Sequence, residues 1–81
     1  MLDPQVIENW IAEGMSCELV DVEGDGHHFE AIVVSAEFEG LNRVQRQQRV
    51  FKTVKEHLDA GTLHALAMKT MTPAEWAEKG I

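Results

Sequence analysis

The sequence predicts an α+β domain with the element order helix, strand, strand, helix, strand, helix. Segments with apolar residues three to four positions apart indicate the helices, segments with alternating apolar residues indicate the strands, and turn signals separate them. With 81 residues, the chain is expected to form one domain, residues 1–81, around a single core. The economical arrangement is a three-stranded mixed sheet with the helices packed mainly on one face.

The first part of the chain predicts a helix followed by a β-hairpin. Asp3 precedes a proline, as an N-cap residue does, and the helix is expected to run to about Glu13. Strand patterns follow at residues 17–23 and 27–35. Residues 24–26, Gly-Asp-Gly, form a turn signal, so the two strands are expected to pair in an antiparallel hairpin.

A long helix is predicted to begin near Asn42, after a core residue at Phe38 and a turn at Gly40. The helix is expected to end at residues 59–61, where aspartate and glycine interrupt the pattern. Its predicted buried stripe consists of Val44, Phe51, Val54 and Leu58.

The third strand is predicted to open with His64, because apolar residues alternate around that position. A side chain at the beginning of a strand can reach a partner while its neighbours stay buried, which makes His64 the first candidate for chemistry. Thr72 and Glu75 have the spacing of a capping box and predict a final helix that packs Trp76 against the domain. The alternating residues are Leu63, Ala65 and Ala67.

The charge is unevenly distributed. A net charge of −7 argues against simple phosphate-driven nucleic-acid binding, yet five of the seven lysine and arginine residues lie within the long helical segment. This basic segment could contact phosphates or an acidic protein surface, or it could be a solvated helix face. Its cations are Arg43, Arg46, Arg49, Lys52 and Lys55.

Several classes of protein are disfavoured. No glycine-rich phosphate loop or nucleophile arrangement is present, so the chain is not expected to be an enzyme. No apolar run approaches the roughly 18 residues of a spanning helix, and no signal peptide is evident, so a cytoplasmic protein is expected. The order of elements resembles the type II KH arrangement, but the Gly-x-x-Gly loop that clamps nucleotide backbones is missing.

Cysteine and histidine residues limit the possible metal chemistry. The single cysteine, Cys17, excludes an internal disulfide and any iron-sulfur site built from this chain's thiolates alone, so a partner would have to supply sulfur. His27 and His28 are consecutive, and consecutive side chains in an extended segment point to opposite faces. These two histidines alone are therefore disfavoured as a chelating pair.

Separated segments of the chain match the motifs of a known family in the same order: GDGHHF (24–29) leading into IVVS (32–35), FEGLNRVQRQQRVF (38–51), HALAMKT (64–70) and TPAEW (72–76). Through these segments, from Val6 to Trp76, the chain resembles the BolA family. Family proteins often have arginine-histidine-arginine in the middle motif, whereas this chain has Arg-Gln-Gln-Arg at 46–49. That departure and the short Gly-Asp-Gly loop are similar to the bacterial IbaG (YrbA) branch.

The resemblance implies a heterodimer with a monothiol, CGFS-type glutaredoxin that holds a bridging [2Fe-2S] cluster. It implies roles in iron-sulfur cluster trafficking and in iron, redox or acid-stress regulation. His64 matches the family's C-terminal cluster ligand, and the second ligand would be His28, which matches the family's histidine-phenylalanine pair, or His27. One cysteine of the glutaredoxin and the thiol of glutathione would complete the set, so the isolated chain is not expected to bind the cluster stably.

A DNA-binding transcriptional role is also described for the family, and the basic segment 43–55 would be its site. Phosphate contacts would make affinity fall steeply with salt. Because the chain as a whole is acidic, weak DNA binding is the alternative function. The free protein is expected to be a monomer or a weak homodimer joined through exposed strand edges.

Overall fold

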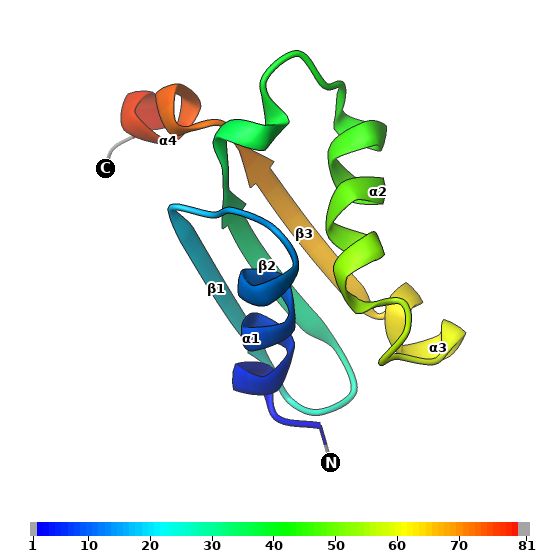
Figure 1. The fold of residues 1–81 in the computed structure, drawn as a ribbon. Helices are drawn as coiled ribbons and strands as arrows, with labels where there is room; N and C mark the ends of the chain where they lie inside the picture. The colour runs from blue at the N-terminus through cyan, green and yellow to red at the C-terminus, as the bar shows by residue number, and fades with distance from the viewer. Residues whose placement is uncertain (1, 80–81) are drawn as a thin grey trace.

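The computed structural model describes residues 2–79 and confirms the α+β class (Figure 1). The predicted order is confirmed, with one short helix, α3, added before the last strand. None of the helices in the described residues is long and apolar enough to cross a membrane. The elements are α1 (Pro4–Gly14), β1 (Leu19–Gly24), β2 (Phe29–Val34), the 3-10 turn η1 (Ala36–Phe38), α2 (Arg43–Val54), α3 (Ala60–His64), β3 (Leu66–Met71) and α4 (Pro73–Lys79).

The three strands form one sheet in the order β1-β2-β3. β1 pairs with β2 in antiparallel fashion, as a hairpin requires, and β2 pairs with β3 in parallel. α1 and α2 lie on one face of this sheet, and α4 lies beyond the end at which β3 finishes (Figure 1). The predicted mixed sheet with helices mainly on one face is therefore confirmed.

The core lies between this face of the sheet and the two long helices. Every second residue of the strands points toward the helices, as the two-residue period of a strand requires, and these residues are largely buried. No helix of the described part of the chain covers the centre of the opposite face (Figure 1), and Asp21, Glu30 and Lys69 are exposed there. The buried core includes Ile7, Ile11, Val22, Phe29, Ala31, Val33, Phe38, Val50, Val54 and Leu66.

The buried stripe of α2 differs from the predicted one. Val54 is fully buried, Phe51 is half-buried, and Leu58 is buried although it lies beyond the end of the helix. Val44 is 61% exposed, so its predicted burial was wrong. The stripe is centred on Val50 and Val54, and at about 100° per residue Val44 points roughly 120° away from Val50.

The third strand begins later than predicted. It starts at Leu66, and His64 is the last residue of α3 rather than the first of a strand. The reason is a local cap: the carboxylate of Asp59 accepts the backbone N–H of Thr62 at 2.8 Å and starts a single helical turn. The final helix has the predicted capping box, but Trp76 is 38% exposed and packs less closely than expected.

Candidate functional site

Two histidines from distant parts of the sequence lie at the same end of the sheet. The parallel register aligns Phe29 with Leu66, the first residues of β2 and β3. The backbone N–H of Phe29 donates to the carbonyl of Ala65 at 2.9 Å. His28 immediately precedes Phe29, and His64 immediately precedes Ala65. Both histidines are exposed, so this end of the sheet presents two imidazoles to solvent.

The loop that carries His27 and His28 is held by Asp25. The carboxylate of Asp25 accepts the backbone N–H groups of both histidines, each at 2.8 Å. These two hydrogen bonds, the one from His28 first, hold the pKa of Asp25 below its ordinary value. Both histidines were predicted to begin a strand, but β2 starts only at Phe29, so they belong to the loop. Their backbone is fixed while both residues remain exposed.

Gly24 and Gly26 allow this loop to be short. A Cβ on Gly24 would lie 2.5 Å from the carbonyl oxygen of His28 and 2.5 Å from the ring of Phe29. Gly26 has a φ of 95°, a conformation that residues with a side chain rarely adopt. The Gly-Asp-Gly sequence therefore places His28 directly at the entrance to β2.

Few candidate metal ligands lie at the histidine end of the sheet. Within residues 2–79, no group of three or more histidine, cysteine, aspartate or glutamate residues is placed to bind a metal ion. Cys17 lies near the opposite end of the sheet, since it precedes Leu19, which pairs with Val34. Burial first, and then the charge of Glu37, raise the pKa of the Cys17 thiol. A metal group at the histidines would need further ligands from elsewhere.

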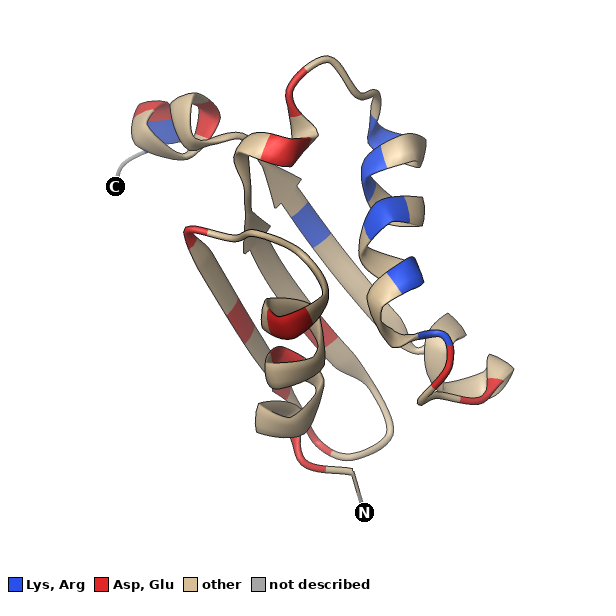
Figure 2. Ribbon diagram, viewed as in Figure 1, with Lys and Arg blue, Asp and Glu red and all other residues tan. Residues whose placement is uncertain are grey.

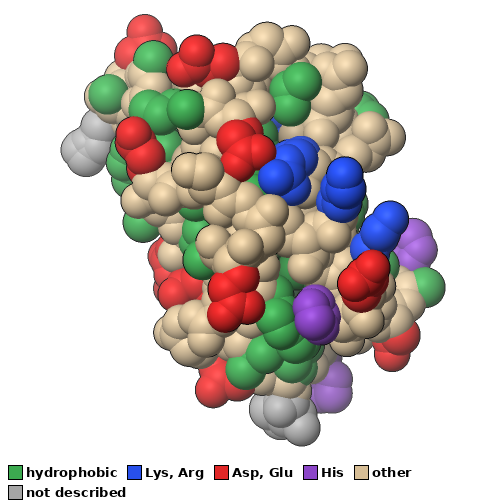
Figure 3. All heavy atoms as spheres, in the orientation of Figure 1, with side chains coloured by type: hydrophobic (Ala, Val, Ile, Leu, Met, Phe, Trp, Pro, Cys, Tyr) green, Lys and Arg blue, Asp and Glu red, His purple; other side chains and the backbone are tan. Residues whose placement is uncertain are grey.

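A fourth histidine, His57, has a different environment. Its ring stacks on that of Trp10, with centroids 4.3 Å apart and planes 7° from parallel. The contact joins α1 to the segment after α2. No local sequence pattern points to His57, because it and Trp10 are far apart in the sequence. Figure 3 shows exposed histidine side chains beside and below the lowest of the basic side chains in that view.

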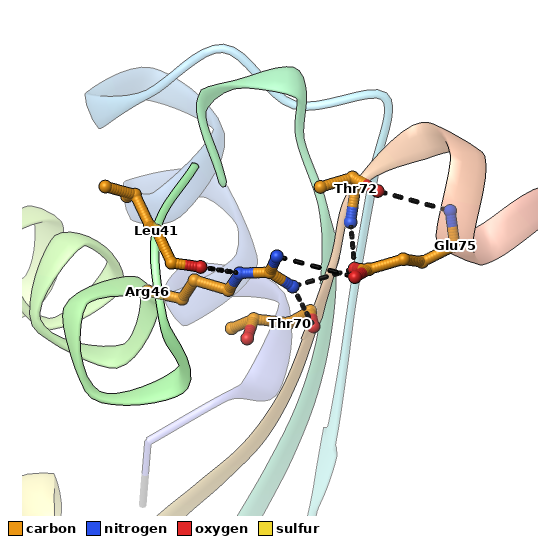
Figure 4. A network of polar contacts seen from close by, with 5 residues as sticks. All are labelled: Leu41, Arg46, Thr70, Thr72 and Glu75. Carbon is orange, nitrogen blue, oxygen red and sulfur yellow. Dashed lines mark hydrogen bonds and ion pairs between the residues drawn. The ribbon is translucent and has the colours of Figure 1, made fainter. Parts of the chain in front are cut away.

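Arg46 joins three elements of the fold (Figure 4). Its Nε donates to the carbonyl of Leu41 at 3.0 Å, and its Nη1 donates to the carbonyl of Thr70 at 3.4 Å. Nη1 also pairs with the carboxylate of Glu75 at 2.7 Å, and the guanidinium lies 5.9 Å from the ring centroid of Phe38. The hydrogen bond from Arg46 is the main reason why the pKa of Glu75 is lowered. The side chain of Arg46 is only 15% exposed, which indicates a structural role.

Arg49 is also engaged within the fold. Its guanidinium lies 3.0 Å from the carboxylate of Glu37 and donates to the carbonyl of Gly14 at 3.2 Å. Glu37 in turn accepts the backbone N–H of Ser16 at 2.6 Å. This backbone hydrogen bond first, and then Arg49, hold the pKa of Glu37 below its ordinary value. Arg49 therefore links α2 to η1 and to the end of α1.

The remaining cations of the basic segment do not share one face of α2. Arg43, Lys52 and Lys55 are exposed (Figure 2). Arg43 and Lys52 are nine residues apart, which at about 100° per residue places them on opposite sides of the helix. The structure thus places two of the five predicted surface cations in ion pairs and spreads the others around α2.

Comparison with known proteins identifies the family. A family model described as BolA-like protein matches residues 12–75, which is most of the chain. The chain belongs to the BolA family.

Relatives and solved structures agree with this assignment. The acid stress protein IbaG of Escherichia coli (strain K12) is 39% identical over 88% of this chain and 84% of its own length. The DNA-binding transcriptional regulator BolA of Haemophilus influenzae is 33% identical over 89% of this chain and 79% of its own length. A solved BolA homologue from Coxiella burnetii is 40% identical, superposes with a TM-score of 0.83, and covers 95% of this chain and 99% of its own. The resemblance to the BolA family and its IbaG-like branch is confirmed.

Proposed function

We propose that this BolA-family chain is a cytoplasmic adaptor, not an enzyme, that binds a monothiol, CGFS-type glutaredoxin and shares a bridging [2Fe-2S] cluster with it. The single observation that carries the proposal is the position of His28 and His64 at one end of the sheet, exposed and joined through the hydrogen bond from Phe29 to Ala65. The adaptor would serve iron-sulfur cluster trafficking and iron, redox or acid-stress regulation. The likeness to an acid stress protein supports the last of these roles.

The histidines of this chain could supply two of the four ligands of a shared cluster. A [2Fe-2S] cluster takes four ligands, and two histidines can replace two cysteines on one of its irons. His64 would be one ligand and His28 the other, with His27 as the alternative from the same loop. The cysteine of the glutaredoxin and the thiol of glutathione would supply the remaining two ligands. Because this chain offers no third ligand among its described residues, the cluster would be held only in the complex.

The test is anaerobic reconstitution of the cluster with the glutaredoxin and glutathione, with and without this chain, followed by visible absorption and circular dichroism. We expect a new spectrum at one-to-one stoichiometry that differs from that of the glutaredoxin alone. His64→Ala should shorten the lifetime of the cluster, and His28→Ala and His27→Ala should identify the second ligand.

His57→Ala is the matched control. It also removes an exposed histidine, but one that stacks on Trp10. Size-exclusion chromatography of the same mixtures shows whether each variant still binds the apo-glutaredoxin. If the His64→Ala complex retains the spectrum and lifetime of the unmodified complex, the assignment of His64 is wrong.

A second candidate function is weak DNA binding, which the likeness to a DNA-binding transcriptional regulator favours. Arg43, Lys52 and Lys55 would contact phosphates, with smaller parts for Arg46 and Arg49 because both are engaged in ion pairs. The test is the salt dependence of binding to a duplex. Each phosphate contact should contribute about −0.9 to the log-log slope, and Lys52→Glu with Lys55→Glu should remove two contacts. A slope near zero would reject this function.

A further inference from the structure

Within residues 2–79, the outer edge of β3 is an unpaired strand edge. In this part of the chain β3 is the last strand of the sheet and pairs only with β2. The carbonyls of Ala65 and Met71 accept hydrogen bonds from the β2 side. Because backbone groups alternate in direction along a strand, those of Met68 and Thr70 point away from β2. The Thr70 carbonyl contacts Arg46, which confirms this direction.

A groove runs along this edge. It has a volume of about 800 Å³ and lies between the beginning of α2, β3 and α4. Ile32, Met68 and the exposed ring of Trp76 contribute apolar surface to it. Arg43, Lys69 and Lys79 contribute charge, and all three are exposed. Figure 2 shows the basic band of β3 beside the basic bands of α2.

The edge and the open face of the sheet beside it carry charges of two signs. In the groove, Arg46 is paired with Glu75, so Arg43, Lys69 and Lys79 outnumber the one remaining carboxylate, that of Glu78. A second, smaller hollow of about 250 Å³ lies beside the groove, over the open face of the sheet that β1, β2 and β3 share. This second hollow shares Arg43 and Lys69 with the groove, and its carboxylates are Asp21, Glu23 and Glu30. The surface is thus basic at the α4 end of the edge and acidic across the open face of the sheet, on β1 and β2.

We propose that this edge docks an extended acidic peptide segment of a partner protein, added as a fourth strand beside β3. The backbone of the segment would pair with the outward N–H and C=O groups of Met68, and its carboxylates would lie near Arg43, Lys69 and Lys79. An apolar side chain of the segment would cover Met68 and Trp76. Main-chain pairing supplies affinity in such strand addition, and alternate side chains supply specificity.

The two-sign pattern favours a peptide over the other occupants. A nucleic acid carries uniform negative charge and would bring phosphates toward Asp21, Glu23 and Glu30 on a chain whose net charge is −7. A peptide can confine its carboxylates to the basic end. A second copy of this chain would have to bring its own α2 against the first, because α2 flanks the groove.

The test uses the chain without any cluster, so it does not depend on the proposed glutaredoxin function. The probe is a fluorescent peptide of about ten residues, long enough for one added strand. One half of it alternates glutamate with valine and the other half alternates threonine with valine. A peptide with lysine in place of glutamate is the control. Binding is measured by fluorescence anisotropy of the labelled peptide. The binding site is located from the ¹⁵N amide shifts and the hydrogen exchange of this chain in complex with the unlabelled peptide.

We expect the acidic peptide, but not the lysine peptide, to bind and to slow hydrogen exchange of the Met68 and Thr70 amides. Lys69→Glu should weaken binding about fivefold, the effect of reversing one exposed charge pair. Arg43→Glu and Trp76→Ala are further variants at exposed positions. Lys52→Glu makes the same charge change on the side of α2 opposite Arg43, and it should leave peptide binding unchanged.

The proposal would be overturned if the acidic peptide failed to bind or bound no better than the lysine peptide. It would also be overturned if the acidic peptide bound without any effect on the amides of β3. A single-stranded oligonucleotide that binds the groove more tightly than the peptide would make the edge a nucleic-acid site instead. A homodimer in sedimentation that Lys69→Glu dissociates would assign the edge to a second copy of the chain.

Discussion

Truncation of Arg46 should destabilise the fold, although sequence reasoning places this residue on a partner surface. Arg46→Ala removes a charged hydrogen bond to the Leu41 carbonyl at 3.0 Å, a longer one to the Thr70 carbonyl at 3.4 Å, and the contact with the Phe38 ring at 5.9 Å. A charged hydrogen bond contributes about 1.5–3 kcal/mol and a cation–π contact about 0.5–1 kcal/mol. After allowance for the long second bond, we expect the free energy of unfolding to fall by about 2 kcal/mol.

Urea unfolding followed by tryptophan fluorescence measures this loss, and the melting temperature should fall by about 10 °C. Arg46→Lys keeps the charge but not the planar fork, so it should lie between the unmodified protein and Arg46→Ala. Arg43→Ala is the control, since Arg43 is an exposed cation of the same helix, and should change stability by less than about 0.5 kcal/mol. Equal effects of Arg46→Ala and Arg43→Ala would refute the structural role of Arg46.

Two further predictions concern packing and pH. Gly14→Ala would place a Cβ 2.7 Å from the side chain of Thr53, so α1 and α2 would have to move apart. This movement should lower the free energy of unfolding by about 1–3 kcal/mol in the same urea assay. Gly61→Ala, where the nearest atom is 3.5 Å away, should instead stabilise the protein by about 0.5–1 kcal/mol, and a loss at Gly61 equal to that at Gly14 would contradict the argument. Folding lowers the pKa values of Glu37 and Glu75 below their ordinary value of 4.5, so their contribution to stability is complete above that pH and is lost as the pH falls through the lowered values. Unfolding measured from pH 6 downward should therefore show a loss of stability that is shallower in Glu75→Gln, and an unchanged slope in that variant would show that the pair has no role in acid stability.

Local patterns predicted most of the fold. The caps at Asp3 and Asn42 fix where α1 and α2 begin, and the hydrogen bonds that the two caps require are present. The error at α3 also has a local cause. Short apolar alternation does not distinguish a strand from a single helical turn, and the Asp59 cap decides for the turn. His64 consequently lies two residues before the start of the parallel ladder rather than within it.

The environment of the site residues could not be predicted from local patterns, because their partners lie far away in sequence. The basic segment gives no sign that Arg46 pairs with Glu75 or that Arg49 pairs with Glu37. The same holds for His28 and His64, which only the register between β2 and β3 brings together. The sequence shows which residues could bind a metal or carry charge, whereas their contacts are decided by tertiary packing.

The central claim is that imidazoles of this chain ligate the shared cluster, and pulsed EPR of the reduced complex tests it most directly. The chain is labelled with ¹⁵N-histidine, the glutaredoxin is left unlabelled, and the cluster is reduced by one electron. We predict ¹⁵N couplings of directly bound imidazole nitrogen, lost in part in His64→Ala and unchanged in His57→Ala. A complex that holds the cluster without any ¹⁵N coupling from this chain would contradict histidine ligation.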